Sequence, residues 1–163
     1  MNPTKVKLKC IYNKIFEVPI DILKKVNFIS GIVEQASEEK KIILLREVES
    51  KDFEKILDYL NHYKNFEPKK IPKPFPERTD DTFLRKILND DWTFNFLKQF
   101  TLDETISIVN CANYLEIEGL TNILSAKLAH EMCNCDIEEA RRKFEIEPDE
   151  DTDEEFNLNE LIS

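Results

Sequence analysis

Residues 112–120 read A-N-Y-L-E-I-E-G-L and stand between two amphipathic helical patterns. Upstream, Thr101 and Glu104 have the spacing of a capping box, in which each side chain accepts a hydrogen bond from a backbone N–H at the start of a helix. Apolar residues then recur at helical spacing as far as Leu115. Gly119 is one of only two glycines in the chain, and we expect it to form a left-handed helix end or a tight corner.

A second apolar stripe follows this segment and consists of Leu120, Ile123, Leu124, Lys127, Leu128 and Met132. Asp136 is placed to cap a further short helix that carries Ile137, Ala140 and Phe144. A short run of helices has little mass with which to cover so many apolar side chains. The sequence therefore predicts an exposed apolar groove that a partner helix completes.

The N-terminal part has the pattern of a small sheet with helices around it. Residues 5–10 alternate lysines with apolar side chains and residues 15–18 favour a strand, so together they predict a hairpin. The continuous apolar run at 42–45 predicts a third, buried strand. Helical spacing between residues 21 and 36 predicts two short helices, and Ser50 is a suitable N-cap for a longer one.

Composition changes along the chain indicate its organisation. Residues 64–79 contain four prolines within nine residues and predict an irregular loop. Residues 145–155 contain eight acidic side chains in eleven, which is typical of a solvated tail. We expect the proline-rich loop to separate an α/β part from an all-helical part, and residues 148–163 to form an acidic tail.

Charge and composition exclude several classes of protein. The chain is 41% hydrophobic, enough for a packed core, and carries a net charge of −10. Residues 1–79 have a net charge of +4 and residues 80–163 of −14, so we expect no nucleic-acid partner. No apolar run is long enough to span a membrane. The four cysteines lack the spacing of a disulfide framework, and we expect a cytoplasmic and nuclear protein.

No pattern in the sequence indicates an enzyme, a cofactor or a metal site. Two glycines cannot supply a phosphate-binding loop. His62 and His130 are far apart and pair with no nucleophile at a catalytic spacing. The group His130-x-x-Cys133-x-Cys135 offers one loose pair of cysteines, whereas structural zinc needs four ligands. We expect these thiols to act as small apolar side chains.

The segment at 112–120 closely resembles the A-N-Y-L-D-I-K-G-L signature of the S-phase-kinase-associated adaptors, which bridge F-box proteins to cullins in SCF ubiquitin ligases. Four further blocks agree in order, and the resemblance covers residues 5–147. They are a helix at 55–64 that ends in H-x-K, R-T-D-D at 78–81 after a proline-rich loop, W-x-x-x-F-L at 92–97, and E-E-A-R-R-K-F-E-I at 138–146, which is similar to E-E-I-R-K-T-F-N-I.

The resemblance implies an α/β (α+β) BTB/POZ fold with a small three-stranded sheet at 4–118, followed by F-box-binding helices at 119–147. It implies an adaptor subunit of an SCF-type cullin-RING E3 ubiquitin ligase. The cullin-binding residues that it implies are Asn113, Tyr114 and Phe96. The F-box-binding residues that it implies are Leu120, Ile123, Leu124, Lys127, Leu128, Phe144 and Ile146.

The chain departs from the family at two places. Family members usually end in a tryptophan-containing helix that closes over the F-box, whereas this chain has Phe156, Leu158 and Leu161 there. Residues 82–91 are an insertion with no inherited role.

Two alternative hypotheses remain at this stage. One is a BTB scaffold outside ubiquitin ligation, such as an elongin-C-like or kinetochore subunit. The other is a homodimer that forms through the apolar groove when no F-box protein is present.

Overall fold

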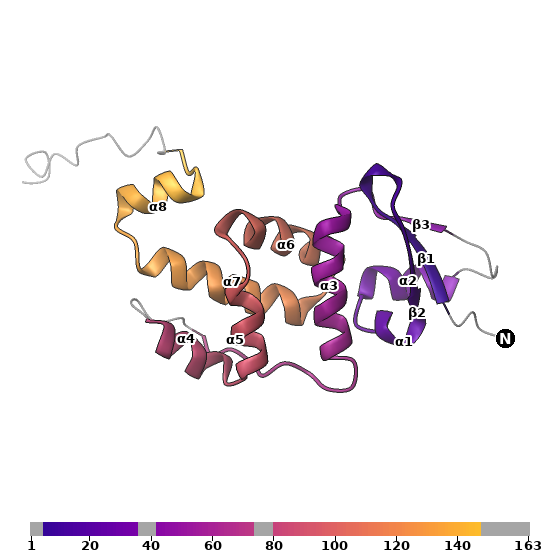
Figure 1. Ribbon diagram of the computed structural model, residues 1–163, viewed down its shortest axis with the longest axis horizontal. Helices are drawn as coiled ribbons and strands as arrows, with labels where there is room; N and C mark the ends of the chain where they lie inside the picture. The colour runs from indigo at the N-terminus through magenta and orange to yellow at the C-terminus, as the bar shows by residue number, and fades with distance from the viewer. Residues whose placement is uncertain (1–4, 36–41, 74–79, 148–163) are drawn as a thin grey trace, which may run out of the picture.

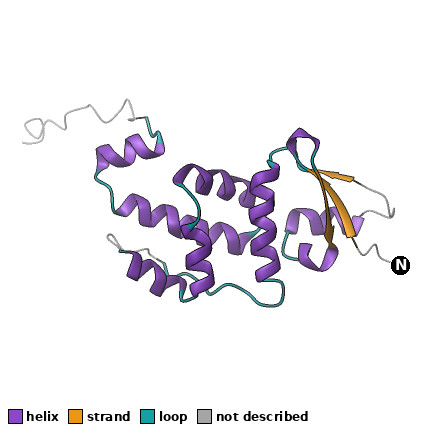
Figure 2. Cartoon of the chain, in the orientation of Figure 1, coloured by secondary structure: helices purple, strands orange, loops and turns teal. Residues whose placement is uncertain are grey.

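The structure is a computed structural model and describes residues 5–35, 42–73 and 80–147 of the chain. A three-stranded sheet lies at one end of the molecule, and helices make up most of the rest (Figures 1 and 2). The sheet has the order β2-β1-β3. β1 (Lys5–Lys9) pairs antiparallel with β2 (Ile15–Pro19) and parallel with β3 (Ile42–Leu44). The predicted hairpin, third strand and α+β fold are therefore confirmed.

The sheet is buried on one face only. Val6 and Leu8 of β1 point into the core, while the lysines between them face outward. The prediction of a wholly buried third strand is wrong, because Ile42 and Leu44 are 43% and 50% exposed and only Ile43 of β3 is buried. β3 is an edge strand, and successive side chains of a strand point to opposite faces.

Three helices cover the inner face of the sheet. They are α1 (Ile20–Leu23), α2 (Asn27–Gln35) and α3 (Ser50–His62), and all three were predicted. Phe53, Ile56 and Leu60 of α3 are fully buried, as their helical spacing indicated. The predicted cap at Ser50 is wrong, since Ser50 is the first helical residue and no side chain caps this helix.

Five helices follow the proline-rich loop, and the sequence patterns predicted the last three of them. They are α4 (Asp81–Leu88), α5 (Asp91–Lys98), α6 (Leu102–Tyr114), α7 (Glu118–Cys133) and α8 (Ile137–Phe144). The predicted capping box begins α6: the Thr101 N–H donates to Glu104 Oε2 at 2.8 Å, and the Glu104 N–H donates to Thr101 Oγ1 at 3.2 Å. The predicted cap at Asp136 begins α8.

The corner between α6 and α7 is built differently from the prediction. The left-handed residue is Glu116, with φ of 56°, while Gly119 lies in the first turn of α7 with an ordinary backbone. A Cβ atom at Gly119 would come within 2.5 Å of Tyr59 Oη and 2.9 Å of Pro68 Cγ. Glycine is required here because α3 and the proline-rich loop approach the backbone closely.

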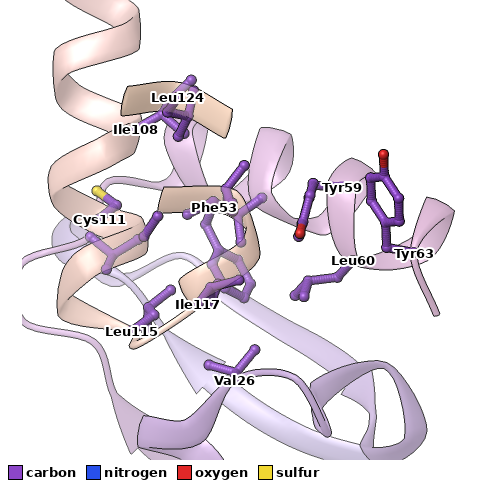
Figure 3. Close-up of a cluster of buried hydrophobic side chains, with 14 of the residues drawn as sticks. Val26, Phe53, Tyr59, Leu60, Tyr63, Ile108, Cys111, Leu115, Ile117 and Leu124 are labelled. Atoms are coloured by element: carbon purple, nitrogen blue, oxygen red, sulfur yellow. The ribbon is translucent and has the colours of Figure 1, made fainter. Parts of the chain in front are cut away.

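One hydrophobic core runs through the described residues, from Val6 of β1 to Leu124 of α7. Figure 3 shows part of it, with Leu115 and Ile117 from the α6–α7 corner in the same cluster as Val26 and Phe53. The core thus continues across the expected boundary between residues 118 and 119. The expected acidic tail at 148–163 lies outside the described residues. Within the described chain, no helix combines the length and apolar character needed to cross a membrane.

Candidate protein-binding surfaces

The segment at 112–120 alternates between buried and exposed side chains. Leu115 and Ile117 are buried at 0% and 2% exposure and hold the corner to the core. The N–H of Ile117 donates to the carbonyl oxygen of Ala112 at 2.9 Å and so closes the end of α6. With these two side chains turned inward, Asn113 and Glu116 face solvent.

Tyr114 and its neighbours form the first candidate surface, which we call the Tyr114 surface and define as Phe28, Asn113, Tyr114 and Glu116. The half-buried rings of Tyr114 and Phe28 lie 5.0 Å apart between centroids. The Phe28 N–H also donates to the carbonyl oxygen of Leu115 at 3.4 Å, which joins α2 to the corner. Among the described residues, nothing hydrogen-bonds the side-chain amide of Asn113, so it is available to a partner.

The structure does not bring Phe96 to this surface. Phe96 of α5 is 4% exposed and stacks on Trp92 at 4.8 Å between ring centroids. Its other ring neighbours are Phe100 and Tyr59, at 4.9 and 6.4 Å. The placement of Phe96 on a cullin-facing surface is therefore corrected: it packs in the core, because α5 turns its aromatic face toward α3.

The apolar stripe of α7 is also mostly core. Leu120, Ile123 and Leu124 are 0%, 2% and 0% exposed, because α7 packs against α6 and also contacts α4 and α5. The prediction that this stripe forms an open groove is wrong for these three residues, which cannot touch a partner from these positions. Leu128 is half-buried and remains accessible.

Lys127 was predicted to contact an F-box but is buried at 7% exposure. Its ammonium donates to the carbonyl oxygen of Leu97 at 2.7 Å and also to that of Phe100. Burial lowers the pKa of Lys127. Lys127 therefore stabilises the carboxyl end of α5, where helix carbonyls lack partners. Lys127, which the sequence suggested as a surface residue, is thus a buried donor to the backbone carbonyl groups at the end of α5.

The second candidate surface lies where α7 ends and α8 begins. We call it the α7–α8 surface and define it by its accessible apolar side chains, Leu128, Met132, Ile137, Phe144 and Ile146. Met132, Ile137 and Ile146 are 41%, 74% and 47% exposed. Leu128 and Phe144 are half-buried. Three of the predicted F-box residues, Leu128, Phe144 and Ile146, belong to this surface.

α8 is held by its own capping interactions and by little else. Asp136 Oδ1 accepts a hydrogen bond from the Glu139 N–H at 2.7 Å, and Lys143 pairs with Glu139 at 3.0 Å. Glu145 ends the helix with a left-handed φ of 50°. No residue of α8 is buried, so among the described residues its apolar face is not fully covered, as the apolar face of an amphipathic helix normally is.

α7 separates the two surfaces. It begins directly after the α6–α7 corner and ends three residues before α8. A helix of 16 residues is about 24 Å long at 1.5 Å per residue. The Tyr114 surface adjoins α2 near the sheet, whereas α8 lies at the other end of the molecule (Figure 1). One partner at the Tyr114 surface and another at the α7–α8 surface would therefore not compete for the same residues.

Sequence reasoning missed Phe28, Met132 and Ile137 as surface residues. Phe28 was assigned to a helix, but nothing local indicates that its ring meets Tyr114, 86 positions along the chain. Met132 and Ile137 were read as members of apolar stripes. The sequence of α8 did contain a usable signal. A short helix with so few apolar residues has little to bury against a core, so Ile137 could have been expected to stay accessible.

The cysteines and acidic side chains add no metal site to these surfaces. Within the described ranges, no group of three or more His, Cys, Asp or Glu side chains is placed to hold a metal ion. All four cysteines are free thiols. Burial raises the pKa of Cys10 and of Cys111 to about 11, so both remain protonated thiols at neutral pH.

Comparison with known proteins gives one family match. Residues 4–65 match a family model described as "Skp1 family, tetramerisation domain". This range covers the sheet, the three helices on it and the start of the proline-rich loop.

Relatives match over nearly the whole chain. The S-phase kinase-associated protein 1 homolog of Tetrahymena thermophila is 32% identical over 96% of this chain and 91% of its own length. The SCF ubiquitin ligase complex protein SKP1a of Dictyostelium discoideum is 31% identical over 94% of this chain and 90% of its own. The SKP1-like protein 18 of Arabidopsis thaliana is 28% identical over 97% and 94%.

Proposed function

Because this chain belongs to the Skp1 family, we propose that it is the adaptor subunit of an SCF-type ubiquitin ligase and joins F-box proteins to a cullin. The Dictyostelium relative is named as a component of the SCF ubiquitin ligase complex. The observation that carries the proposal is the separation of two accessible surfaces along α7. An adaptor needs two sites that can be occupied together, and it supplies no catalytic group of its own.

The Tyr114 surface is proposed to bind the cullin. Tyr114 presents a large ring that is held in place by Phe28, so little conformational freedom is lost when a partner covers it. The free amide of Asn113 can donate and accept hydrogen bonds beside that ring. Glu116 and Glu118 are exposed nearby, which favours a basic partner surface.

The α7–α8 surface is proposed to bind the F-box. Its exposed methionine and aliphatic side chains are suited to the apolar face of a partner helix. Leu120, Ile123 and Leu124 support the surface from inside the core and do not contact the partner directly. An acidic substitution at Leu124 would therefore test core packing, whereas substitutions at Met132 and Ile137 test binding.

Co-purification with matched variants tests the proposal. We expect the tagged chain to recover a cullin and several F-box proteins. The double variant Asn113→Ala with Tyr114→Ala removes side chains from the centre of one surface and should weaken cullin binding by about 2 kcal/mol, roughly thirtyfold, while F-box proteins are retained. Met132→Asp with Ile137→Asp should do the reverse, because a carboxylate would be buried without a partner.

Ile15→Asp is the control for these variants. It places a carboxylate on another exposed apolar side chain, 47% exposed on the sheet, and should change neither interaction. Recovery of neither a cullin nor an F-box protein at low salt contradicts the proposal. Loss of both partners in either double variant, with the fold intact by circular dichroism, would contradict the assignment of two separate surfaces.

A further inference from the structure

The two edges of the sheet differ in how they are protected. β2 ends in Pro19, which has no N–H to offer a further strand, and Glu17 of β2 pairs with Lys7 at 3.4 Å. β3, at the opposite edge, exposes Ile42 and Leu44. Charged residues or prolines normally protect exposed edge strands, and an unprotected apolar edge accepts a further strand.

The surroundings of this edge are basic. Lys7 and Lys9 of β1 lie directly opposite Ile42 and Leu44 in the parallel register. Arg46 is exposed two residues after Leu44. In the part of the chain that the structure describes, Lys9 and Arg46 form no ion pair. Pairing of β3 with β3 of another copy would bring like charges together, which is unfavourable. The edge is suited to an acidic strand.

The chain carries a segment of the required chemistry outside the described residues. Residues 148–163 contain seven acidic side chains and no lysine or arginine. In an extended strand, Glu154, Phe156, Leu158 and Glu160 would share one face, because they are spaced by two. Two apolar side chains flanked by carboxylates match an edge that exposes Ile42 and Leu44, with Arg46 farther along the chain and Lys7 and Lys9 on the neighbouring strand.

We propose that the edge of β3, which pairs with no further strand among the described residues, binds residues 154–160 of a second copy of this chain as an added strand. Phe156 and Leu158 cover Ile42 and Leu44, one flanking glutamate lies near Arg46, and Lys7 and Lys9 add positive potential from the next strand. A second copy supplies the strand because α8, which leads into this segment, lies at the opposite end of the molecule from the sheet (Figure 1). Such head-to-tail contacts do not close on themselves, so association increases with concentration.

A peptide titration tests this contact. The receptor is the full chain carrying Phe156→Asn and Leu158→Asn, which disables its own segment, and the probe is a peptide of residues 148–163. We expect amide NMR shifts confined to β3 and the neighbouring β1. Raising NaCl from about 50 to about 500 mM should weaken binding at least about fivefold, because exposed charges are screened.

Two receptor variants and one control peptide make the test specific. Ile42→Lys with Leu44→Lys protects the edge and should abolish binding, whereas Ile15→Lys, on the same face but at the other edge, should leave it unchanged. A scrambled peptide of the same composition should bind at least about tenfold more weakly, because it loses the alternation.

Equal binding of the scrambled peptide, shifts on α7 and α8 in place of β3, or no binding would each overturn the proposal. Sedimentation of the unaltered full chain should show association that increases with concentration and is lost in the Phe156→Asn, Leu158→Asn variant. This inference is independent of the adaptor function, so failure of one leaves the other intact.

Discussion

Gly119 has no room for even a methyl group. The Tyr59 hydroxyl and the Pro68 ring would lie 2.5 and 2.9 Å from a Cβ atom placed there. Tyr59 is 1% exposed and cannot swing into solvent. A single missing side chain thus allows α3, the proline-rich loop and the first turn of α7 to meet.

Gly119→Ala should destabilise the protein by about 1–3 kcal/mol, the usual cost of overpacking a core. Urea unfolding measures the effect. Gly31→Ala is the matched control: Gly31 lies within α2 with nothing inside 4 Å of its added Cβ, and the substitution should stabilise by about 0.5–1 kcal/mol. Tyr59→Phe should recover part of the loss at Gly119. Equal stability of Gly119→Ala and the unsubstituted chain would contradict this account.

The sequence indicated that position 119 requires glycine, but it did not show the structural reason for that requirement. A glycine after a helical pattern usually indicates a left-handed helix end. Here that conformation belongs to Glu116, and the need for glycine comes from Tyr59, which is 60 positions away in the sequence. Close approach between distant segments leaves no local pattern.

At the scale of elements, Asp90 joins the end of α3 to the start of α5. Its carboxylate accepts hydrogen bonds from the N–H groups of Trp92 and Thr93, at 3.2 and 3.3 Å, and from the Tyr63 hydroxyl at 2.7 Å. Burial alone would raise the pKa of Asp90, but these bonds and that from the Thr93 hydroxyl together hold its pKa below the ordinary 3.8. Burial also raises the pKa of Tyr63 to about 12, so Tyr63 remains a donor.

Asp90→Ala should lower the free energy of unfolding by about 1–2 kcal/mol at pH 7, as loss of an N-cap does. Because the folded-state pKa of Asp90 is lowered, its charge contributes stability above pH 3.8, and this contribution is lost as pH falls through the folded-state pKa. Asp90→Asn keeps a capping oxygen without the charge. The stability difference between the unsubstituted chain and the Asp90→Asn variant, from urea unfolding at pH 7 to 2, should therefore shrink below pH 3.8. A difference that stays constant down to the acid end of this range would contradict this assignment.

Elements were predictable from sequence where spacing alone defines them. The capping box at Thr101 and the cap at Asp136 are local patterns, and both begin helices as predicted. Burial of whole faces was less predictable. The apolar stripe beginning at Leu120 reads the same whether it faces α6 or a partner, and only the packing of α7 on α6 decides it. The apolar run at 42–45 was wrongly predicted to be a fully buried strand for the same reason. The residues of a strand do not show whether it lies at the centre or at the edge of a sheet.

For the whole molecule, one core supports two accessible surfaces at the two ends of α7. The core continues from β1 to α7, so the Tyr114 surface and the α7–α8 surface are parts of one folded body. α8 extends from this body without a buried residue of its own. The Tyr114 surface lies before the start of α7, and the α7–α8 surface begins at Leu128, in the last third of that helix.

Of the candidate site, the sequence indicated Asn113, Tyr114, Leu128, Phe144 and Ile146 as accessible residues, and the structure places each of them at least partly at the surface. It could not separate them from Phe96 and Lys127, which the resemblance also assigned to binding but which lie inside. Lysine burial is especially hard to foresee, because the carbonyl groups that receive its ammonium come from the end of α5, about 30 positions earlier.

The most direct test is the mass of the complex that forms when the chain is mixed with an F-box domain and a cullin N-terminal domain, measured by native mass spectrometry. Two surfaces at opposite ends of α7 predict a complex containing one copy of each protein, in which Asn113→Ala with Tyr114→Ala removes only the cullin. Complexes that contain either partner but never both would contradict the account.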